Sequence, residues 1–214
     1  MAAEGTLNML KLFTFPGTIG LACHIALEEA GADYEIEIVD FRADAQRKPE
    51  FLAINPKSRV PALATDRGVI TEAPAILSYV AETHPAANLA PLGDAYAMAQ
   101  VQAFNTYLCS WVHPAAAHRF RGYRWADDPA AIKELARKAP EVFAEAMTLI
   151  ERELFKGPWV MGEAYSTCDA YLFIVAGWLP RDGIDPALFP RIAEHTARMT
   201  ARPAVSKVLA VLAS

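Results

Sequence analysis

The sequence contains little cysteine, no excess of positive charge and no long apolar run, and each shortage excludes a class of protein. The three cysteines, Cys23, Cys109 and Cys168, lie far apart and form no Cys-x-x-Cys pair, so we expect neither a disulfide framework nor a metal site. The formal net charge of −5 argues against nucleic acid as a partner. The longest apolar run, residues 170–179, is too short to span a membrane. The first eight residues lack the pattern of a signal peptide, so we expect a soluble, cytoplasmic protein.

The first part of the chain, residues 8–87, has the pattern of an α/β domain. In order, the sequence predicts a strand at Met9–Phe13, a helix from Thr18 to Gly31, a strand at Tyr34–Val39, an irregular segment at Phe41–Leu52, a hairpin of Pro61–Ala64 and Gly68–Thr71, and a helix at Glu72–Glu82. The first strand, helix and strand imply a right-handed parallel crossover, to which the hairpin adds strands of mixed direction. We therefore expect a thioredoxin-like domain with a mixed four-stranded sheet.

After a linker at residues 88–93, the remainder of the chain, residues 94–214, shows only helical periodicity. Helices are expected at residues 94–121, 129–154, 167–178, 188–201 and 203–213. Ser166-Thr167-Cys168-Asp169 fits a capping box at the start of the third helix. Its role should be structural, and replacing Asp169 by Ala should cost about 1–2 kcal/mol. The predicted fold class is an α/β domain followed by an all-α helical bundle.

Residues 55–63, Asn-Pro-Lys-Ser-Arg-Val-Pro-Ala-Leu, contain two prolines five residues apart with polar and basic residues between them. Val60-Pro61 is the candidate for a cis peptide bond, because only X-Pro pairs adopt cis at low cost. An extended residue before such a proline presents its N–H and C=O groups to a peptide-like ligand. Further along, Glu72 lies where a strand is expected to lead into a helix. Its carboxylate and the N–H groups of that helix could hold both charges of an amino-acid head group, or Glu72 could simply complement the helix dipole.

Four motifs together resemble the cytosolic glutathione transferases, and most closely the bacterial beta-class enzymes. They are Phe13-Thr14-Phe15-Pro16-Gly17, residues 55–63, Thr71-Glu72-Ala73-Pro74-Ala75-Ile76, and Ser166-Thr167-Cys168-Asp169-Ala170-Tyr171-Leu172-Phe173. In this order they extend the resemblance over essentially the whole chain. The resemblance implies a homodimer that binds glutathione as a co-substrate and transfers its thiol to an electrophilic, apolar small molecule. It implies no metal.

The resemblance also assigns residues to the binding of glutathione. The main chain of Val60 would pair with the cysteinyl part, while Glu72 and the N–H group of Ala73 would hold the γ-glutamyl end. The family usually has serine or glycine at the position of Ala73, so a hydroxyl contact is missing here. Arg59 stands where the family often has glutamine and could reach a carboxylate. Ile19 occupies the place of the beta-class cysteine, but its side chain can neither form a mixed disulfide nor donate to sulfur.

The group that activates the thiol has two candidates. Thr14 stands in place of the family's usual tyrosine, and either Thr14 or Thr18 could donate a hydroxyl to the sulfur, as serine does in other classes. Helix N-termini lower thiol pKa values to roughly 3.5–7.5, so the first helical turn would assist. The alternative is a structural role, with Thr14 ending a strand and Thr18 capping a helix. His113 lies where beta-class sequences carry a histidine near the sulfur, although an isolated histidine is often structural.

Further candidates are a cysteine and two aromatic residues. Cys23 lies one helical turn beyond Ile19 and could be a displaced nucleophile, but a small buried cysteine is the favoured interpretation. Tyr123 and Trp125, near the end of a predicted helix, are candidate walls of the second-substrate pocket. The departures at the tyrosine and cysteine positions leave two alternatives to a transferase. One is a non-catalytic glutathione-binding or interaction protein, and the other is a glutathione-dependent lyase, isomerase or peroxidase.

Overall fold

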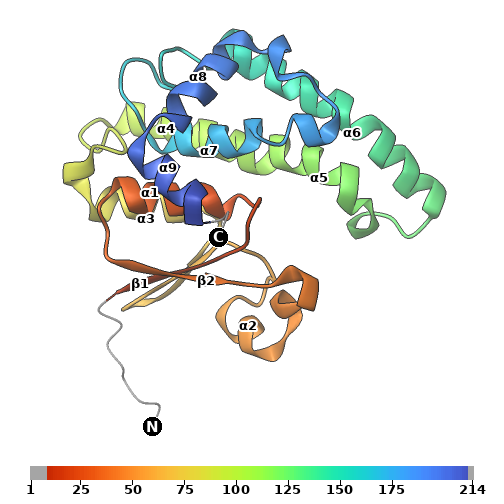
Figure 1. The fold of residues 1–214 in the computed structure, drawn as a ribbon, viewed down its shortest axis with the longest axis horizontal. Coiled ribbons are helices and arrows are strands. Elements are labelled where there is room, and N and C mark those ends of the chain that lie inside the picture. The colour runs from red at the N-terminus through yellow and green to blue at the C-terminus, as the bar shows by residue number, and fades with distance from the viewer. Residues whose placement is uncertain (1–8, 212–214) are drawn as a thin grey trace. The chain divides into compact units, whose positions relative to one another are not determined.

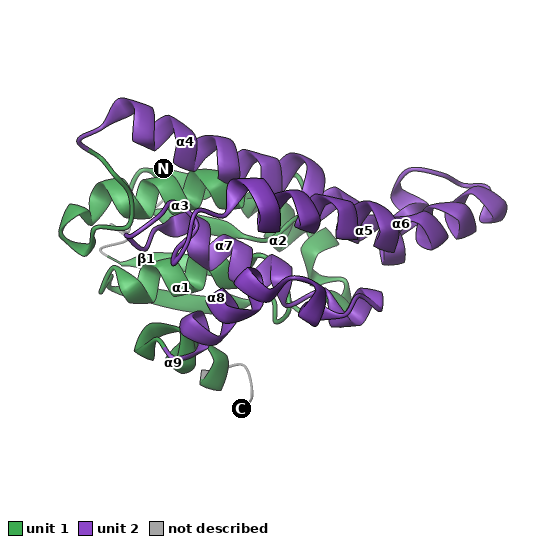
Figure 2. Ribbon diagram, turned by 90° about the horizontal axis from the view of Figure 1, so that it is seen from above, with its two compact units in different colours: residues 1–92, 202–214 green, residues 93–201 purple. Residues whose placement is uncertain are grey.

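The computed structural model describes residues 9–211, and the chain divides into two compact units (Figures 1 and 2). Unit 1 comprises residues 1–92 and 202–214, and unit 2 comprises residues 93–201. The expectation of no signal peptide in the first eight residues lies outside the described part, as do the last two residues of the helix expected at 203–213.

Unit 1 is built on a four-stranded sheet of mixed direction. Its strands are β1 (Leu10–Thr14), β2 (Tyr34–Ile38), β3 (Ala62–Thr65) and β4 (Gly68–Thr71), in the spatial order β2-β1-β3-β4. β1 and β2 are parallel, whereas β3 runs antiparallel to both β1 and β4. The thioredoxin-like sheet, its parallel crossover and its hairpin are therefore confirmed.

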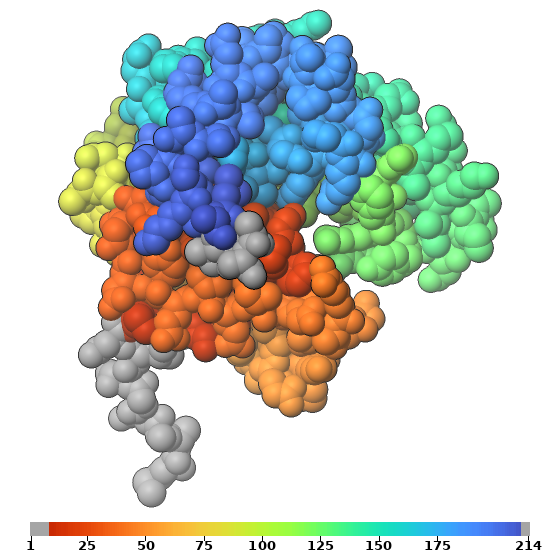
Figure 3. All heavy atoms as spheres, in the orientation of Figure 1, coloured from red at the N-terminus to blue at the C-terminus, as the bar shows by residue number. Residues whose placement is uncertain are grey.

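Helices cover both faces of this sheet. α1 (Gly20–Glu29) and α3 (Ala73–Thr83) lie together on one face, and α2 (Pro49–Ile54) lies towards the other (Figure 1). The segment expected to be irregular forms two short 3₁₀ turns, at Phe41–Ala43 and Ala45–Arg47, and then α2. In the space-filling view this segment, coloured orange, lies at the surface of unit 1 (Figure 3). It is attached to the sheet by apolar packing, with Phe51 of α2 buried against Phe13 of β1.

The last helix, α9 (Pro203–Val211), belongs to unit 1, although it follows the helices of unit 2 in the sequence. Two ion pairs join it to the end of α1. Lys207 Nζ donates to Glu28 over 2.6 Å, and the guanidinium of Arg202, just before α9, makes a bidentate pair with Glu29 over 2.6 and 2.8 Å. These long-range pairs link α9 and the residue before it to the end of α1.

Unit 2 is helical throughout the elements that the structure describes, as expected. It contains α4 (Ala95–Tyr107), α5 (His113–Arg121), α6 (Pro129–Leu149), α7 (Thr167–Ala176) and α8 (Pro190–Thr200). A π-helical turn at Leu108–Val112 connects α4 to α5, and another at Ile150–Leu154 extends α6. Pro114 follows the first of these turns as the second residue of α5, in a helical stretch that continues from α4, because Val112 and His113 both have right-handed helical dihedral angles. Among residues 9–211, no helix combines the length and the apolar character that crossing a membrane requires.

A completely buried carboxylate holds the centre of unit 2 together. The predicted capping box is confirmed, because Ser166 N–H donates to Asp169 Oδ2 over 2.7 Å. The other oxygen, Oδ1, accepts from Val160 N–H over 2.8 Å and lies 3.0 Å from His195 Nε2. Asp169 and His195 are both fully buried. Asp169 therefore joins the start of α7, the loop before it and α8, which is more than a helix cap does.

Asp169→Ala should lower the free energy of unfolding by about 3–5 kcal/mol, more than the loss of a cap, because it leaves several buried donors without an acceptor. Urea denaturation of both proteins measures the difference. Asp185→Ala is the matched control, since the exposed Asp185 accepts from Ala187 N–H over 2.9 Å at the start of a short surface turn. This control should cost only about 1 kcal/mol. Equal losses in the two variants would contradict the central role of Asp169.

Candidate functional site

The register of the sheet brings one end of each of three strands, β1, β3 and β4, to the same side of unit 1. This side, where the strands begin or end, is called the sheet edge. Phe13 of β1 is paired with Ala62 of β3, and Ala62 is paired with Thr71 of β4. This edge therefore carries the end of β1, the start of β3 and the end of β4, which leads directly into α3. The residues predicted to bind glutathione follow or precede these same strand ends, so the fold brings them together although they are far apart in the sequence.

The turn between β1 and α1 differs from the prediction at Thr18. α1 begins at Gly20, Ile19 is its N-cap residue, and no side chain caps the helix. The Thr18 hydroxyl donates instead to Phe15 O over 2.7 Å, and Thr18 is half-buried. The prediction that Thr18 caps this helix is therefore wrong, because its hydroxyl is used within the preceding turn. Ile19 places a buried apolar side chain at the position predicted for the beta-class cysteine.

Thr14 lies beneath the start of α1 and is fully buried. Within the described residues its Oγ1 has no hydrogen-bond partner. A Cβ atom added to Gly20 would lie 2.1 Å from this oxygen, so only glycine fits where α1 crosses the end of β1. The N–H groups of Ile19 and Gly20 donate to no group in residues 9–211. They carry the partial positive charge of the helix N-terminus, which favours an anion.

The loop from Asn55 to Pro61 is held by its own polar side chains. Asn55 is fully buried; its Nδ2 donates to Arg59 O over 2.7 Å, and its Oδ1 accepts from Lys57 N–H over 3.2 Å. The Ser58 hydroxyl donates to Gln46 O over 2.7 Å and so ties the loop to the segment before α2. The Val60-Pro61 bond is cis, as predicted. Val60 precedes β3 and lies outside the β1–β3 ladder, and the side chain of Arg59 is exposed.

Glu72 connects β4 to α3 in an uncommon backbone conformation. Its φ of +74° is in a region that non-glycine residues rarely adopt, at a typical cost of about 1–3 kcal/mol. It is the N-cap residue of α3, so the N–H group of Ala73 belongs to the first turn, whose N–H groups have no partner within the helix. The exposed Glu72 carboxylate accepts from Lys57 Nζ over 2.5 Å. The sequence alone did not single out Lys57, although Lys57 lies within residues 55–63.

Cys23 of α1 cannot be the displaced nucleophile that its position suggested. The residue is fully buried, and its Sγ lies 3.9 Å from Ala73 O, to which the thiol donates. Burial raises the pKa of the Cys23 thiol, so the reactive thiolate is disfavoured. The favoured interpretation of Cys23 as a small buried side chain is confirmed, and it packs α1 against the start of α3.

The remaining candidates lie in unit 2. His113 is the first residue of α5, and its ring packs edge-on against Trp178, with the ring centroids 4.9 Å apart. Tyr123 and Trp125 follow α5 and expose about half of their surface, 54% and 51%. Trp125 packs against His118 with ring centroids 4.1 Å apart. Such exposure is what a contact surface for an apolar molecule requires.

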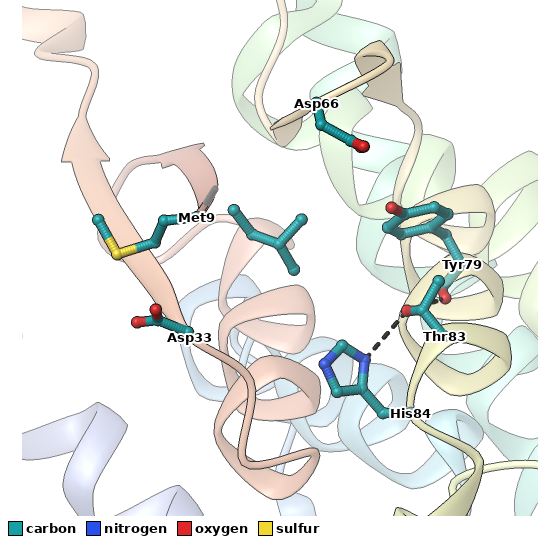
Figure 4. A pocket seen from close by; sticks show the side chains of 7 residues that line it. Met9, Asp33, Asp66, Tyr79, Thr83 and His84 are labelled. Atoms are coloured by element: carbon teal, nitrogen blue, oxygen red, sulfur yellow. Dashed lines mark hydrogen bonds between the residues drawn. The ribbon is translucent and has the colours of Figure 1, made fainter. Parts of the chain in front are cut away.

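A hollow of about 320 Å³ opens at another place in unit 1 (Figure 4). Its lining consists of Met9, Leu10, Asp33, Asp66, Tyr79, Thr83 and His84. These residues lie at the start of β1, just before β2, in the turn between β3 and β4 and in the last part of α3. The predicted glutathione residues lie instead at the end of β1, before β3 and at the start of α3. The hollow is therefore separate from the candidate site. No group of three or more His, Cys, Asp or Glu side chains within residues 9–211 is placed to hold a metal ion.

A thioredoxin-like unit followed by a helical unit defines the class of the protein. Residues 8–82 match the family model described as "Glutathione S-transferase, N-terminal domain". Glutathione S-transferase GstA of Escherichia coli O157:H7 is 31% identical over 203 residues, which cover 94% of this chain and 97% of that protein. The chain belongs to the glutathione S-transferase family.

Solved structures agree with this assignment. A glutathione transferase homologue from Sulfitobacter, with bound glutathione, superposes with a TM-score of 0.92 at 43% identity and covers 95% of this chain and 98% of that chain. A sphingomonad glutathione S-transferase complexed with glutathione has a TM-score of 0.84 at 36% identity, with the same coverage of 95% and 98%. The expected family and fold are thus confirmed over nearly the full length of the chain.

Gly20→Ala should destabilise the protein by about 2–3 kcal/mol, because its methyl group would overlap the Thr14 hydroxyl. Adding Thr14→Ala removes that oxygen, so the double variant should be more stable than Gly20→Ala alone. Urea denaturation of the wild type, the two single variants and the double variant measures this coupling. Strictly additive effects would show that the two residues do not depend on each other.

Proposed function

We propose that this protein binds glutathione at the sheet edge of unit 1, stabilises its thiolate and directs the sulfur at an electrophilic, apolar small molecule. The observation that carries the proposal is the strand register, which places the N-terminal turns of α1 and α3 and the cis-proline loop at a single edge. The reaction would be a nucleophilic addition or substitution, with rate enhancement from positioning of the thiol and from electrostatic stabilisation of its anion.

In the proposed complex, the tripeptide lies along the loop before β3 and across the start of α3. The main chain of Val60 pairs with the cysteinyl part, as an added strand would. The Glu72 carboxylate accepts from the α-ammonium of the γ-glutamyl group, and the N–H group of Ala73 faces the same end of the ligand. Arg59, whose exposed side chain donates from Nη1 to Ser58 O over 3.1 Å, could turn towards a ligand carboxylate. The sulfur then faces the start of α1.

The thiolate is proposed to be stabilised by the N–H groups of Ile19 and Gly20 together with the hydroxyl of Thr18. Lowering a thiol pKa by two units requires about 2.7 kcal/mol of preference for the anion, which a few aimed donors can provide. Thr18 must turn its hydroxyl from the neutral Phe15 carbonyl to the charged sulfur, an exchange that favours the stronger charge-assisted bond. Thr14 is fully buried under Gly20, so it supports the helix start instead of donating to the ligand.

The second substrate is proposed to bind to unit 2. Tyr123 and Trp125 offer exposed rings to an apolar molecule, and His113 stays the proposed catalytic side chain of α5. A cytoplasmic homodimer is the proposed working form.

A non-catalytic glutathione-binding protein is the alternative that three observations favour. Ile19 gives no side-chain donor, Thr14 is buried, and the Thr18 hydroxyl is already engaged with Phe15. A protein with these residues could bind the tripeptide without activating its thiol. Ionisation of the bound thiol therefore distinguishes such a binding protein from a transferase and from a glutathione-dependent lyase, isomerase or peroxidase.

The pH dependence of kcat/KM for conjugation of 1-chloro-2,4-dinitrobenzene tests the transferase proposal. The rate should rise with pH through an inflection well below the ordinary thiol pKa of about 8.5, because the thiolate is the reacting form. Thr18→Ala should raise this inflection by about one unit, since one donor to the anion is lost.

Thr14→Val is the matched control and should leave the inflection unchanged, because its hydroxyl is buried. An inflection that moves with Thr14→Val and not with Thr18→Ala would contradict the assignment of the donor. A wild-type inflection near that of the free thiol, or the absence of turnover, would favour the binding protein.

A further inference from the structure

Lys57 makes contacts that the functional assignment does not explain. Its Nζ donates to Glu72 Oε1 over 2.5 Å and to Thr71 Oγ1 over 2.6 Å. The backbone of Lys57 is positioned by the buried Asn55, whose Oδ1 accepts from its N–H group. The loop therefore presents the ammonium to the end of β4 and to the N-cap residue of α3.

Stability does not account for this ion pair. The side chains of Lys57 and Glu72 are 47% and 55% exposed, and pairs with such exposure contribute little to folding because water screens them. The same exposure leaves both charged groups accessible to a ligand. Two opposite charges on neighbouring segments, at the edge where the γ-glutamyl end is proposed to bind, are better explained by recognition.

The charges of this pair match those of an amino-acid head group. The γ-glutamyl end of glutathione carries an ammonium and a carboxylate on a single carbon atom. The Glu72 carboxylate can accept from the ligand's ammonium, but a donor for the ligand's carboxylate is also needed. Ala73 offers one backbone N–H group and no side-chain donor, and Pro74 has no N–H group. Lys57 is a charged donor that contacts both Glu72 and Thr71.

We propose that Lys57 is a specificity-determining residue that binds the α-carboxylate of the γ-glutamyl group. On binding, the ion pair between Lys57 and Glu72 exchanges partners: Lys57 moves to the ligand's carboxylate, and Glu72 accepts from the ligand's ammonium. The Lys57 ammonium and the Glu72 carboxylate thus each have a charged partner both before and after glutathione binds. The inference rests on the proposed function, because it presumes that glutathione binds at this edge.

The test compares glutathione with two analogues that each lack one charge. One analogue replaces the γ-glutamyl group by 4-aminobutanoyl and lacks the α-carboxylate, while the other replaces it by glutaryl and lacks the α-amino group. Lys57→Met should raise the Kd for glutathione and for the glutaryl analogue by roughly 10–100-fold, the loss typical of one hydrogen bond to a charged group. It should leave the Kd of the 4-aminobutanoyl analogue nearly unchanged.

Further variants make the test specific. Lys57→Arg should retain most of the affinity for glutathione, because it keeps a charged donor. Glu72→Gln should show the reciprocal pattern: it should raise the Kd of the 4-aminobutanoyl analogue more than the Kd of the glutaryl analogue. Lys133→Met, at an exposed lysine of α6 in unit 2, controls for the change in net charge and should bind all three ligands as the wild type does. Isothermal titration calorimetry measures each Kd, and the KM for glutathione should rise in Lys57→Met without a change in kcat.

Two results would overturn the inference alone. One is wild-type affinity for glutathione in Lys57→Met, and the other is an equal loss for all three ligands, which would indicate a general effect on the loop. Failure of the wild-type protein to bind glutathione would instead overturn the proposed function and the inference with it.

Discussion

The pairing of Phe13 with Ala62 and of Ala62 with Thr71 is the constraint on which the rest of the candidate site depends. A shift of one residue in either ladder would turn every side chain of the shifted strand to the opposite face. It would also move the start of α3 relative to the loop before β3. The two helix N-termini and the cis-proline loop can serve one ligand only because this register fixes the three strand ends in a single row.

Charged groups of this chain lie in two opposite environments, one suited to stability and the other to the proposed recognition of a ligand. Asp169 is fully buried and accepts from several donors, so its loss would leave buried groups unsatisfied. Lys57 and Glu72 are about half exposed, so their pair adds little to folding but stays accessible. A carboxylate in the first environment acts as a structural centre, whereas a carboxylate in the second is available to exchange partners with a ligand.

Features that depend on a short stretch of sequence were predictable. The cis bond at Val60-Pro61, the hairpin of β3 and β4 and the capping box at Ser166 each follow from local chemistry, and the structure confirms all three. The role of Thr18 was mispredicted because a hydroxyl can bond backward to Phe15 as easily as forward into a helix.

Long-range features were not predictable from the pattern. The contact between Thr14 and Gly20 depends on how closely α1 crosses β1, and the pair of Lys57 with Glu72 depends on the sheet register. The contact of α9 with α1 brings together residues from distant parts of the sequence, such as Arg202 and Glu29. No local periodicity carries such information.

The central claim is that one edge of unit 1 binds glutathione with its thiol ionised. Ultraviolet difference absorbance of the wild-type protein, titrated with glutathione across a range of pH, tests this claim without any second substrate. The account predicts a saturable thiolate band that is already present well below the ordinary thiol pKa of about 8.5. Saturable binding with no thiolate band at neutral pH would contradict it.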